Sequence, residues 1–333
     1  MYLEELSNLP GVSGDEGQVR QALLKYLQEQ PGEVRVDALG NVLVRRKAPP
    51  GGKRIMLTAH MDEVGLMVTS IEKSGHLRFE AVGMLDPRVL VAKGVRVGRE
   101  GIPGVIGSKA IHLQKPDERR KPYQLEQLFI DIGAKNKEEA EKLVSPGDYV
   151  SFAGTFTPLG EGYYRGKAFD DRAGCSVLLE LLLEYPHLAF DAAFTVQEEV
   201  GSRGAAVAAY SLNPDKAVVL EGTSAADIPG TDPEGSATRL GEGPAITFMD
   251  QSVIADRGLV RELVRAAEGA GLPYQYRRFT GGQTDAGAVS LAREGVPCTV
   301  VSVPCRYIHS PHCLLQERDL KLTVDLIRAW LEG

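Results

Sequence analysis

Residues 54–62 read Arg-Ile-Met-Leu-Thr-Ala-His-Met-Asp, and this stretch sets the expected fold class. Apart from Arg54 and Thr58, the run from Arg54 to Ala59 is apolar, which predicts a strand covered on both faces, as in the middle of a parallel sheet. His60 and Asp62 come just after this run. Because ligands bind beyond the carboxyl ends of strands in open α/β sheets, we expect both side chains to lie at a functional site.

A similar apolar run precedes this stretch, and apolar runs alternate with amphipathic segments again in the second half of the chain. Strands are expected at residues 42–44, 192–196, 216–220 and 298–303. Helices are expected at residues 173–184, 257–270, 285–293 and 316–331. This rhythm predicts an α/β fold with a mixed, mostly parallel sheet covered by helices on both faces.

Between these parts, residues 67–161 have a different texture, with short alternating runs broken by Gly, Pro and Asp. Strands are expected at residues 76–79, 89–91, 95–97, 105–107 and 148–152, and one helix at 136–143. We therefore predict a small β-barrel-like domain at 67–161, inserted into an α/β domain made of residues 1–66 and 162–333.

Near the start of the chain, Ser13 and Glu16 have the spacing of a capping box. This spacing predicts that a helix begins there. Apolar residues at helical intervals predict the face that it buries, namely Val19, Leu23, Tyr26 and Leu27.

Composition narrows the class of protein. The net charge of −7 does not favour binding to phosphate, so nucleic acid is not an expected partner. The four cysteines form no CxxC pair, which favours reduced thiols and a cytoplasmic location. The N-terminal sequence lacks the features of a signal peptide, and no apolar run approaches the length that spans a bilayer, so no membrane association is expected.

The candidate functional residues are acids and histidines near the ends of predicted strands. They are His60 with Asp62, Asp170 with Asp171, Glu198 with Glu199, Glu221, and His309. Any one of them alone is more often a structural or solvated group. Several at equivalent strand ends instead indicate one shared site, and imidazole nitrogen and carboxylate oxygen suit zinc and similar ions.

Charge counting favours two divalent ions. Two such ions, three carboxylates and a bridging hydroxide sum to a neutral inner shell, which suits a partly buried site. A fourth carboxylate outside this shell is then available to take a proton from water. The adjacent pair Glu198 and Glu199 offers one residue for each purpose.

Six segments in this order resemble the tetrahedral aminopeptidases, a family of dinuclear metallopeptidases that includes glutamyl and leucyl aminopeptidases. The segments are residues 59–65 (AHMDEVG), 168–174 (AFDDRAG), 197–201 (QEEVG), 221–223 (EGT), 281–286 (GGQTDA) and 306–311 (RYIHSP). The resemblance covers almost the whole chain, including the position and size of the insert, and it implies a zinc-peptidase-like fold.

The resemblance also implies a role for each residue. Its metal ligands are His60, Asp170 as the bridging ligand, Glu199, Glu221 and His309. Glu198 matches the general base, and Asp62 matches an acid that orients His60. The peptide bond between Asp170 and Asp171 is expected to be cis. Glu221 departs from the pattern, since many members of the family carry Asp there.

Two other polar residues lie in these segments. Asp285 is suited to contact the substrate or the metal-binding residues, or alternatively to cap a helix. His312 follows His309 by three residues and is not expected to be a ligand, because His309 already fills the family's position.

The resemblance implies an aminopeptidase that removes N-terminal residues from short peptides with two metal ions per subunit, zinc or cobalt, with manganese also possible. It further implies a tetrahedral homododecamer built from dimers, with contacts made by the insert. Arg172, Arg203 and Arg306 either attract an acidic N-terminal residue or pair with the site's own carboxylates.

Two alternatives stay open at this stage. One is a related metal-dependent carboxypeptidase or amide deacylase. The other is a non-catalytic, metal-stabilised assembly protein, which the presence of Glu198 beside Glu199 disfavours, because a structural site has no use for an uncoordinated base.

Overall fold

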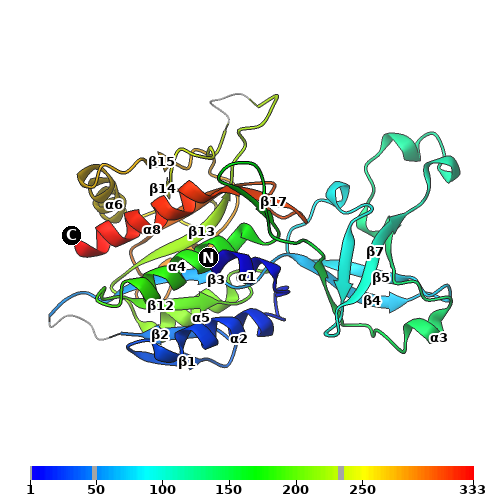
Figure 1. The fold of residues 1–333 in the computed structure, drawn as a ribbon, viewed down its shortest axis with the longest axis horizontal. Coiled ribbons are helices and arrows are strands. Elements are labelled where there is room, and N and C mark those ends of the chain that lie inside the picture. The colour runs from blue at the N-terminus through cyan, green and yellow to red at the C-terminus, as the bar shows by residue number, and fades with distance from the viewer. Residues whose placement is uncertain (1, 47–50, 232–235) are drawn as a thin grey trace.

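A large α/β part and a smaller β-barrel make up the computed structural model, which describes residues 2–46, 51–231 and 236–333 (Figure 1). In the described part of the chain, an 11-stranded sheet runs through the α/β part. Its main path is β1 (Glu33–Val36), β2 (Val42–Arg45), β12 (Asp191–Thr195), β3 (Ile55–His60), β13 (Lys216–Ser224), β16 (Cys298–Arg306), β17 (Cys313–Gln316), β11 (Tyr163–Gly166) and β10 (Thr157–Pro158). Off this path lie β14 (Ala245–Thr247) and β15 (Gln275–Tyr276).

The centre of the sheet is parallel and its margins are antiparallel. Strands β12, β3, β13 and β16 pair in parallel, whereas β1, β2, β17, β11 and β10 pair antiparallel. The expected mixed sheet is therefore confirmed. Because the central strands are parallel, their carboxyl ends meet at one edge, and this edge carries the candidate residues.

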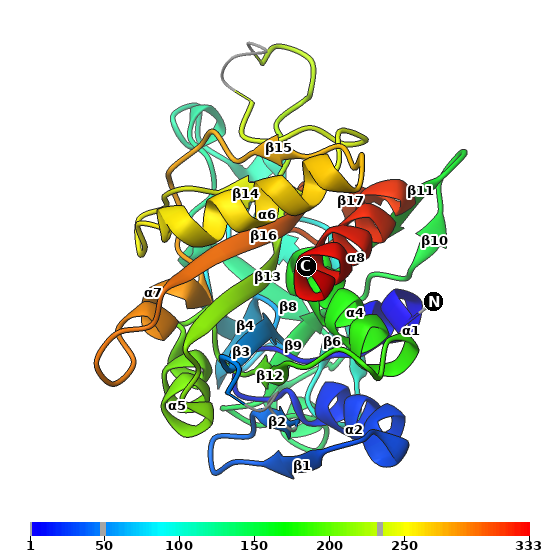
Figure 2. The ribbon, with the colours of Figure 1, turned by 90° about the vertical axis from the view of Figure 1, so that its left-hand side faces the viewer.

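Helices cover both faces of this sheet (Figure 2). One face packs against α1 (Tyr2–Asn8), α2 (Gly17–Tyr26), α4 (Phe169–Glu184), α6 (Arg257–Gly269) and α8 (Glu317–Glu332). The other face packs against α5 (Arg203–Leu212) and α7 (Asp285–Ser290). Side chains of β3 alternate between the two cores, since Leu57 and Ala59 belong to the first and Met56 to the second. Both faces of β3 are thus buried, as its apolar sequence predicts.

A closed six-stranded barrel forms the inserted part. Its strands are β4 (Gly65–Ile71), β5 (Leu77–Val82), β8 (Leu128–Asp131), β7 (Ile102–Ser108), β6 (Gly94–Val97) and β9 (Tyr149–Phe152), and α3 (Lys137–Ala140) lies between β8 and β9 in the chain. The barrel encloses its own apolar core. The expectation of a barrel-like insert is confirmed.

Some local expectations are wrong. Residues 89–91 form no strand, because Pro87–Val89 is a 3-10 turn that directs Leu90 into the barrel core. The capping box is also absent: α2 begins at Gly17, and its N-cap residue Glu16 makes no capping hydrogen bond. Glu221 lies within β13 rather than after it, because this strand continues to Ser224.

No helix in the described ranges is long and apolar enough to cross a membrane.

Candidate active site

Three neighbouring central strands carry four of the candidate residues to one edge of the sheet, while Asp170 lies in the first turn of α4 and His309 in the loop after β16. His60 is the last residue of β3 and pairs with Thr195 at the end of β12. Glu198 and Glu199 lie in the turn that follows β12, and Glu221 lies on β13, the neighbour of β3 on its other side. Their proximity follows from the parallel pairing of the three strands.

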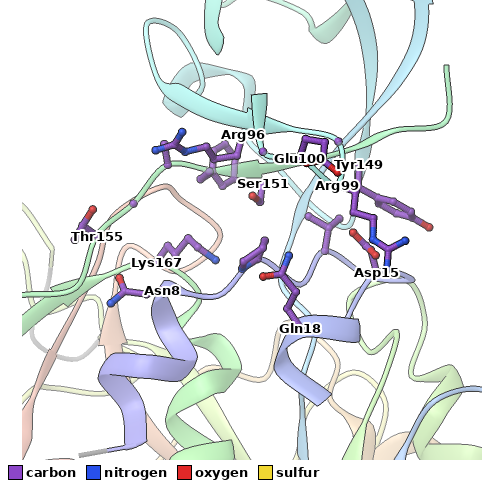
Figure 3. A pocket seen from close by; sticks show the side chains of 17 residues that line it. Asn8, Asp15, Gln18, Arg96, Arg99, Glu100, Tyr149, Ser151, Thr155 and Lys167 are labelled. Carbon is purple, nitrogen blue, oxygen red and sulfur yellow. The ribbon is translucent and has the colours of Figure 1, made fainter. Parts of the chain in front are cut away.

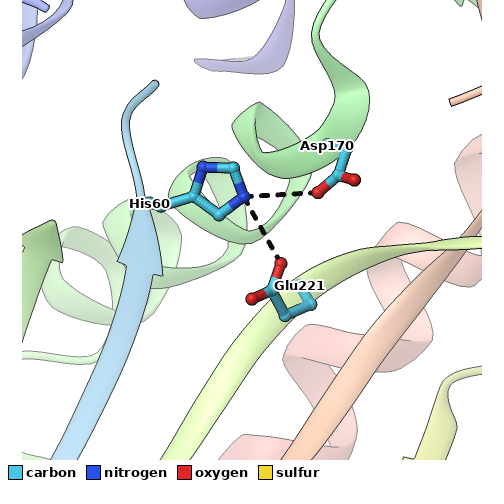
Figure 4. A group of neighbouring side chains, drawn as sticks. All are labelled: His60, Asp170 and Glu221. Atoms are coloured by element: carbon cyan, nitrogen blue, oxygen red, sulfur yellow. Dashed lines mark ion pairs between the residues drawn. The ribbon is translucent and has the colours of Figure 1, made fainter. Parts of the chain in front are cut away.

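His60, Asp170 and Glu221 form the first group that has the composition of a metal site (Figure 4). The Nε2 atom of His60 lies 3.3 Å from Asp170 Oδ1 and 3.5 Å from Glu221 Oε2. His60 is 1% exposed, so these polar atoms meet away from solvent. The Nδ1 atom of His60 lies 3.1 Å from the carbonyl oxygen of Asp62, which leaves Nε2 directed at the carboxylates.

Asp170, Glu199 and His309 form the second group. The Nε2 atom of His309 lies 3.3 Å from Asp170 Oδ2 and 3.3 Å from Glu199 Oε2. Asp170 therefore belongs to both groups and offers one oxygen to each. The peptide bond between Asp170 and Asp171 is cis, as expected. His309 is 28% exposed, so solvent reaches the cluster from this side.

The pKa values in this cluster are shifted because several carboxylates are buried close together. Burial raises the pKa of Glu199 to about 8 and that of Glu221 to about 7. Burial alone would lower the pKa of His309, but the carboxylates of Asp170 and Glu199 outweigh this effect and raise it to about 9. Without a cation, the cluster therefore retains protons at neutral pH.

The donor set fits divalent cations. Each group combines one imidazole nitrogen with two carboxylates, and the ligand atoms of each group lie within 4.8 Å of one another. Glu199 Oε1 and Glu221 Oε1 are buried and have no hydrogen-bond partner. Buried carboxylate oxygens normally have a partner, so these two atoms are further candidates for cation binding.

Asp62 is fully buried and connects His60 to the turn that carries Glu198. Its Oδ1 atom accepts a hydrogen bond from the backbone N–H of Glu198 at 3.0 Å, and its Oδ2 atom accepts one from that of Glu199 at 3.1 Å. Oδ2 also accepts a hydrogen bond from the Ser13 hydroxyl at 2.6 Å. Burial opposes ionisation of Asp62, but His60 and these donors outweigh it and lower the pKa of Asp62.

Glu198 lies beside the cluster but belongs to neither group. Its Oε2 atom is 4.0 Å from His60 Nε2, and its side chain is 11% exposed. Burial raises the pKa of Glu198 well above its usual range, although the charge of His60 opposes the shift. A carboxylate with a raised pKa next to a cation site is suited to accept and return a proton.

Residues 40–326 match the family described as M42 glutamyl aminopeptidase. The chain belongs to this family. A putative aminopeptidase of Acetivibrio thermocellus is 37% identical to this M42 family member, over 98% of the chain and 96% of the relative.

Two solved structures extend the similarity to the whole fold. An aminopeptidase from the archaeon Desulfurococcus kamchatkensis has a TM-score of 0.94 and 38% identity, over 99% of this chain and 93% of the other. The TET1 peptidase of Pyrococcus horikoshii, described as able to assemble into a tetrahedron or a large octahedral shell, has a TM-score of 0.87 and 34% identity, over 98% and 97% of the two chains. The family inferred from the ordered motifs is confirmed, and with it aminopeptidase function.

The remaining polar residues of the motifs lie outside the two groups in this M42 family member. Asp285 is the first residue of α7 and is not its N-cap. Its buried carboxylate accepts a hydrogen bond from the Thr195 hydroxyl at 2.6 Å, and burial raises its pKa to about 6. His312 is exposed.

The three arginines near the motifs have hydrogen-bond partners other than the ligand carboxylates. Arg172 is fully buried and donates to the carbonyl of Met61 at 2.8 Å. Arg306 donates two hydrogen bonds of 2.7 Å to Asp227, and Arg203 donates to a side chain in the turn after β12. These hydrogen bonds go to groups other than the carboxylates of the two candidate cation sites, so pairing with the site's own ligands is not what holds these arginines.

Sequence reasoning missed a charged cluster behind the site. Lys167 and Glu63 are both buried and paired, and Lys167 Nζ also donates to the carbonyl of Leu9 at 2.7 Å. The Glu63 carboxylate accepts a hydrogen bond from Gly11 N–H at 3.0 Å. Glu63 lies within the motif that contains His60, and Lys167 directly precedes the motif that contains Asp170. This nearness in sequence was the signal that could have identified both residues.

Proposed function

We propose that this M42 aminopeptidase binds two divalent metal ions, one at His60, Asp170 and Glu221 and the other at Asp170, Glu199 and His309. The observation that carries the proposal is the position of Asp170, whose two oxygens each lie 3.3 Å from a different histidine. A carboxylate in this position is suited to bridge a pair of ions. Zinc, cobalt and manganese all accept imidazole and carboxylate ligands.

In this proposal Glu198 is the general base. Bound ions would supply Lewis acidity at the scissile carbonyl and lower the pKa of water. Glu198 Oε2 takes a proton from that water and then gives it to the leaving amine, which makes it a general base followed by a general acid. Asp62 accepts hydrogen bonds from the two peptide N–H groups that flank the Cα atom of Glu198, and in this way it holds the backbone that carries the base.

The test is Glu198→Gln, with Glu294→Gln on the exposed surface as a matched control. The amide keeps the size of the side chain but cannot accept the proton. We expect hydrolysis of an aminoacyl chromogenic substrate to fall at least about 100-fold in Glu198→Gln while metal content is retained. Turnover equal to that of Glu294→Gln would refute the role of the base.

Blocked substrates test how the substrate is recognised. In this proposal the enzyme requires a free N-terminal amine and should leave an N-acetylated peptide intact. Cleavage of the acetylated peptide at the rate of the free peptide would contradict this requirement.

We also propose that residues 1–66 and 162–333 form the catalytic domain and that residues 67–161 mediate self-assembly. A structural neighbour assembles into a tetrahedron or octahedral shell, which supports a homododecamer here. Apolar side chains on the insert are also exposed, among them Ile111 and Leu113 at 69% and 63%. Light scattering of the full chain tests the proposal. A mass of twelve 36.0 kDa subunits supports it, and a monomer at all concentrations contradicts it.

A further inference from the structure

The turn after β12 is held by carboxylates from two other segments. The backbone N–H of Gln197 donates to Glu16 Oε1 at 3.2 Å. The next two N–H groups, of Glu198 and Glu199, donate to Asp62. Gln197 has a φ of +57°, a conformation that non-glycine residues adopt only when their surroundings impose it. Three successive backbone donors in this turn are therefore fixed from outside it.

The backbone is the part of Glu198 that is held in place. Within the described residues, its carboxylate makes no hydrogen bond, and the distance of 4.0 Å to His60 Nε2 exceeds hydrogen-bond length. Because no hydrogen bond anchors the side chain and its contact with His60 is long, its direction depends on the conformation of residues 197–199. Groups that fix this turn therefore control where the base lies.

Ser13 and Glu16 supply two of these constraints. Both are buried, with 4% and 3% exposure. The Ser13 hydroxyl donates to Asp62 Oδ2 at 2.6 Å, and Glu16 Oε1 also accepts a hydrogen bond from Gly14 N–H at 2.7 Å. Their spacing predicts a capping box, yet neither side chain caps the helix that follows. Burying these polar groups is costly unless they have partners, and their partners lie around the active-site turn.

The barrel holds the same N-terminal segment from another direction. A cavity of about 560 Å³ between the two parts of the molecule is lined by Asp15 and Gln18 of this segment and by Arg99 and Tyr149 of the barrel (Figure 3). At Gly14, with φ +94°, an added Cβ would lie 2.5 Å from Tyr149 Oη. The positive φ favours glycine at this position, and the close approach of Tyr149 brings the segment into contact with β9.

We propose that Ser13 and Glu16 are positioning residues for the general base, acting on Glu198 through the backbone of residues 197–199 and through Asp62. This inference rests on the role of Glu198 proposed above. Neither residue belongs to the two groups that could hold a cation. Their loss is therefore expected to lower kcat, with KM and metal content little changed.

The experiment compares Glu16→Ala, Glu16→Gln and Ser13→Ala in the full chain, with Asp191→Ala as a matched control. Asp191 is also a buried carboxylate that accepts a backbone hydrogen bond, at 2.9 Å from Arg46 N–H. It lies at the start of β12, whereas the active site lies beyond the end of this strand. The control therefore reports the effect of losing a buried anchor that is remote from the base.

We expect Glu16→Ala to lower kcat about 10-fold to 100-fold, because small misplacement of a catalytic group has effects of this size. Glu16→Gln keeps an acceptor oxygen and should recover kcat to within about threefold of wild type. Ser13→Ala, the mildest change, should lower kcat about threefold or more while KM stays within about twofold. Asp191→Ala should reduce the melting temperature but leave kcat within about twofold.

Three results would overturn the proposal. The first is an unchanged kcat in both Glu16→Ala and Ser13→Ala. The second is a loss of kcat that is proportional to the loss of bound metal. The third is a loss of kcat equal to that in Asp191→Ala when the variants have the same melting temperature. Glu198→Gln is measured in the same assay. If that variant is inactive while Glu16→Ala and Ser13→Ala are normal, the base assignment stands and the positioning role fails. If Glu198→Gln itself is fully active, the proposed function fails first.

Discussion

The substitution Asp62→Asn is the sharpest test of how the site is held together. The change keeps the shape of the side chain but turns one acceptor oxygen into an NH₂ donor. Oδ1 accepts from Glu198 N–H and Oδ2 accepts from Glu199 N–H. Whichever way the amide is oriented, its NH₂ group faces one of these two donors, so one backbone N–H loses its acceptor.

The structure gives the size of the effect. A buried donor without a partner costs about 1–3 kcal/mol, and the lost charge weakens the remaining hydrogen bonds of Asp62 further. We expect the free energy of unfolding to fall by about 2–3 kcal/mol. The same turn carries Glu198, so part of this loss should also raise the activation free energy of the reaction. A rise of about 2 kcal/mol lowers kcat about 30-fold.

The assay is steady-state kinetics on an aminoacyl chromogenic substrate, together with urea unfolding of the same preparations. Asp191→Asn is the control, since its carboxylate is buried at the opposite end of β12. We expect both variants to lose stability and only Asp62→Asn to lose substantial kcat. A kcat for Asp62→Asn within twofold of the control would refute the argument that Asp62 orients the base.

Three further outcomes follow from the structure. In metal-free protein the pKa values of Glu199 and His309 are raised to about 8 and about 9, so the stability that these groups contribute is present at low pH and is lost as the pH rises through these values. After chelation, the melting temperature should therefore fall between about pH 6 and pH 9, and added zinc should raise it more at pH 8 than at pH 6. A melting temperature that does not change with pH would contradict the raised pKa values of this cluster. Gly204→Ala should destabilise the fold by about 1–3 kcal/mol in urea unfolding, because a Cβ there meets neighbouring backbone and side-chain atoms. Gly269→Ala is the control and should not destabilise the fold, because its Cβ meets nothing within 4 Å. Equal effects of the two substitutions would contradict the close packing around Gly204. Ile111→Asp should reduce the assembled mass in light scattering without loss of monomer stability, since this side chain is 69% exposed, and an unaltered assembly would exclude it from a subunit contact.

The large-scale architecture is predictable from this sequence because it depends on apolar periodicity. The run that ends at His60 is apolar on both faces, and the structure places it at the centre of a parallel sheet. Parallel pairing then brings strand ends together, which is why residues far apart in sequence were expected at one site. The bridging position of Asp170 came from the family resemblance, and the structure places its two oxygens beside two different histidines.

Features that depend on distant partners were misread or missed. Ser13 and Glu16 match a local capping pattern, but the partner of Ser13 is Asp62, 49 residues away, and that of Glu16 is Gln197, 181 residues away. Helix α5 was also missed. Four of its ten residues are alanine, so its buried face has few of the large apolar side chains that mark a helix, although it covers one face of the sheet. Spacing alone does not show which partner a short polar motif will choose.

In the proposed site, each subunit holds a pair of divalent ions shared by Asp170. Elemental analysis of the fully active, dialysed protein, with Asp170→Asn prepared in parallel, measures this pair. We expect two tightly bound ions per subunit in the wild type and weakened binding of both in the variant, because Asp170 belongs to both groups. A single ion per subunit at full activity, or two ions retained by Asp170→Asn with unchanged affinity, would contradict it.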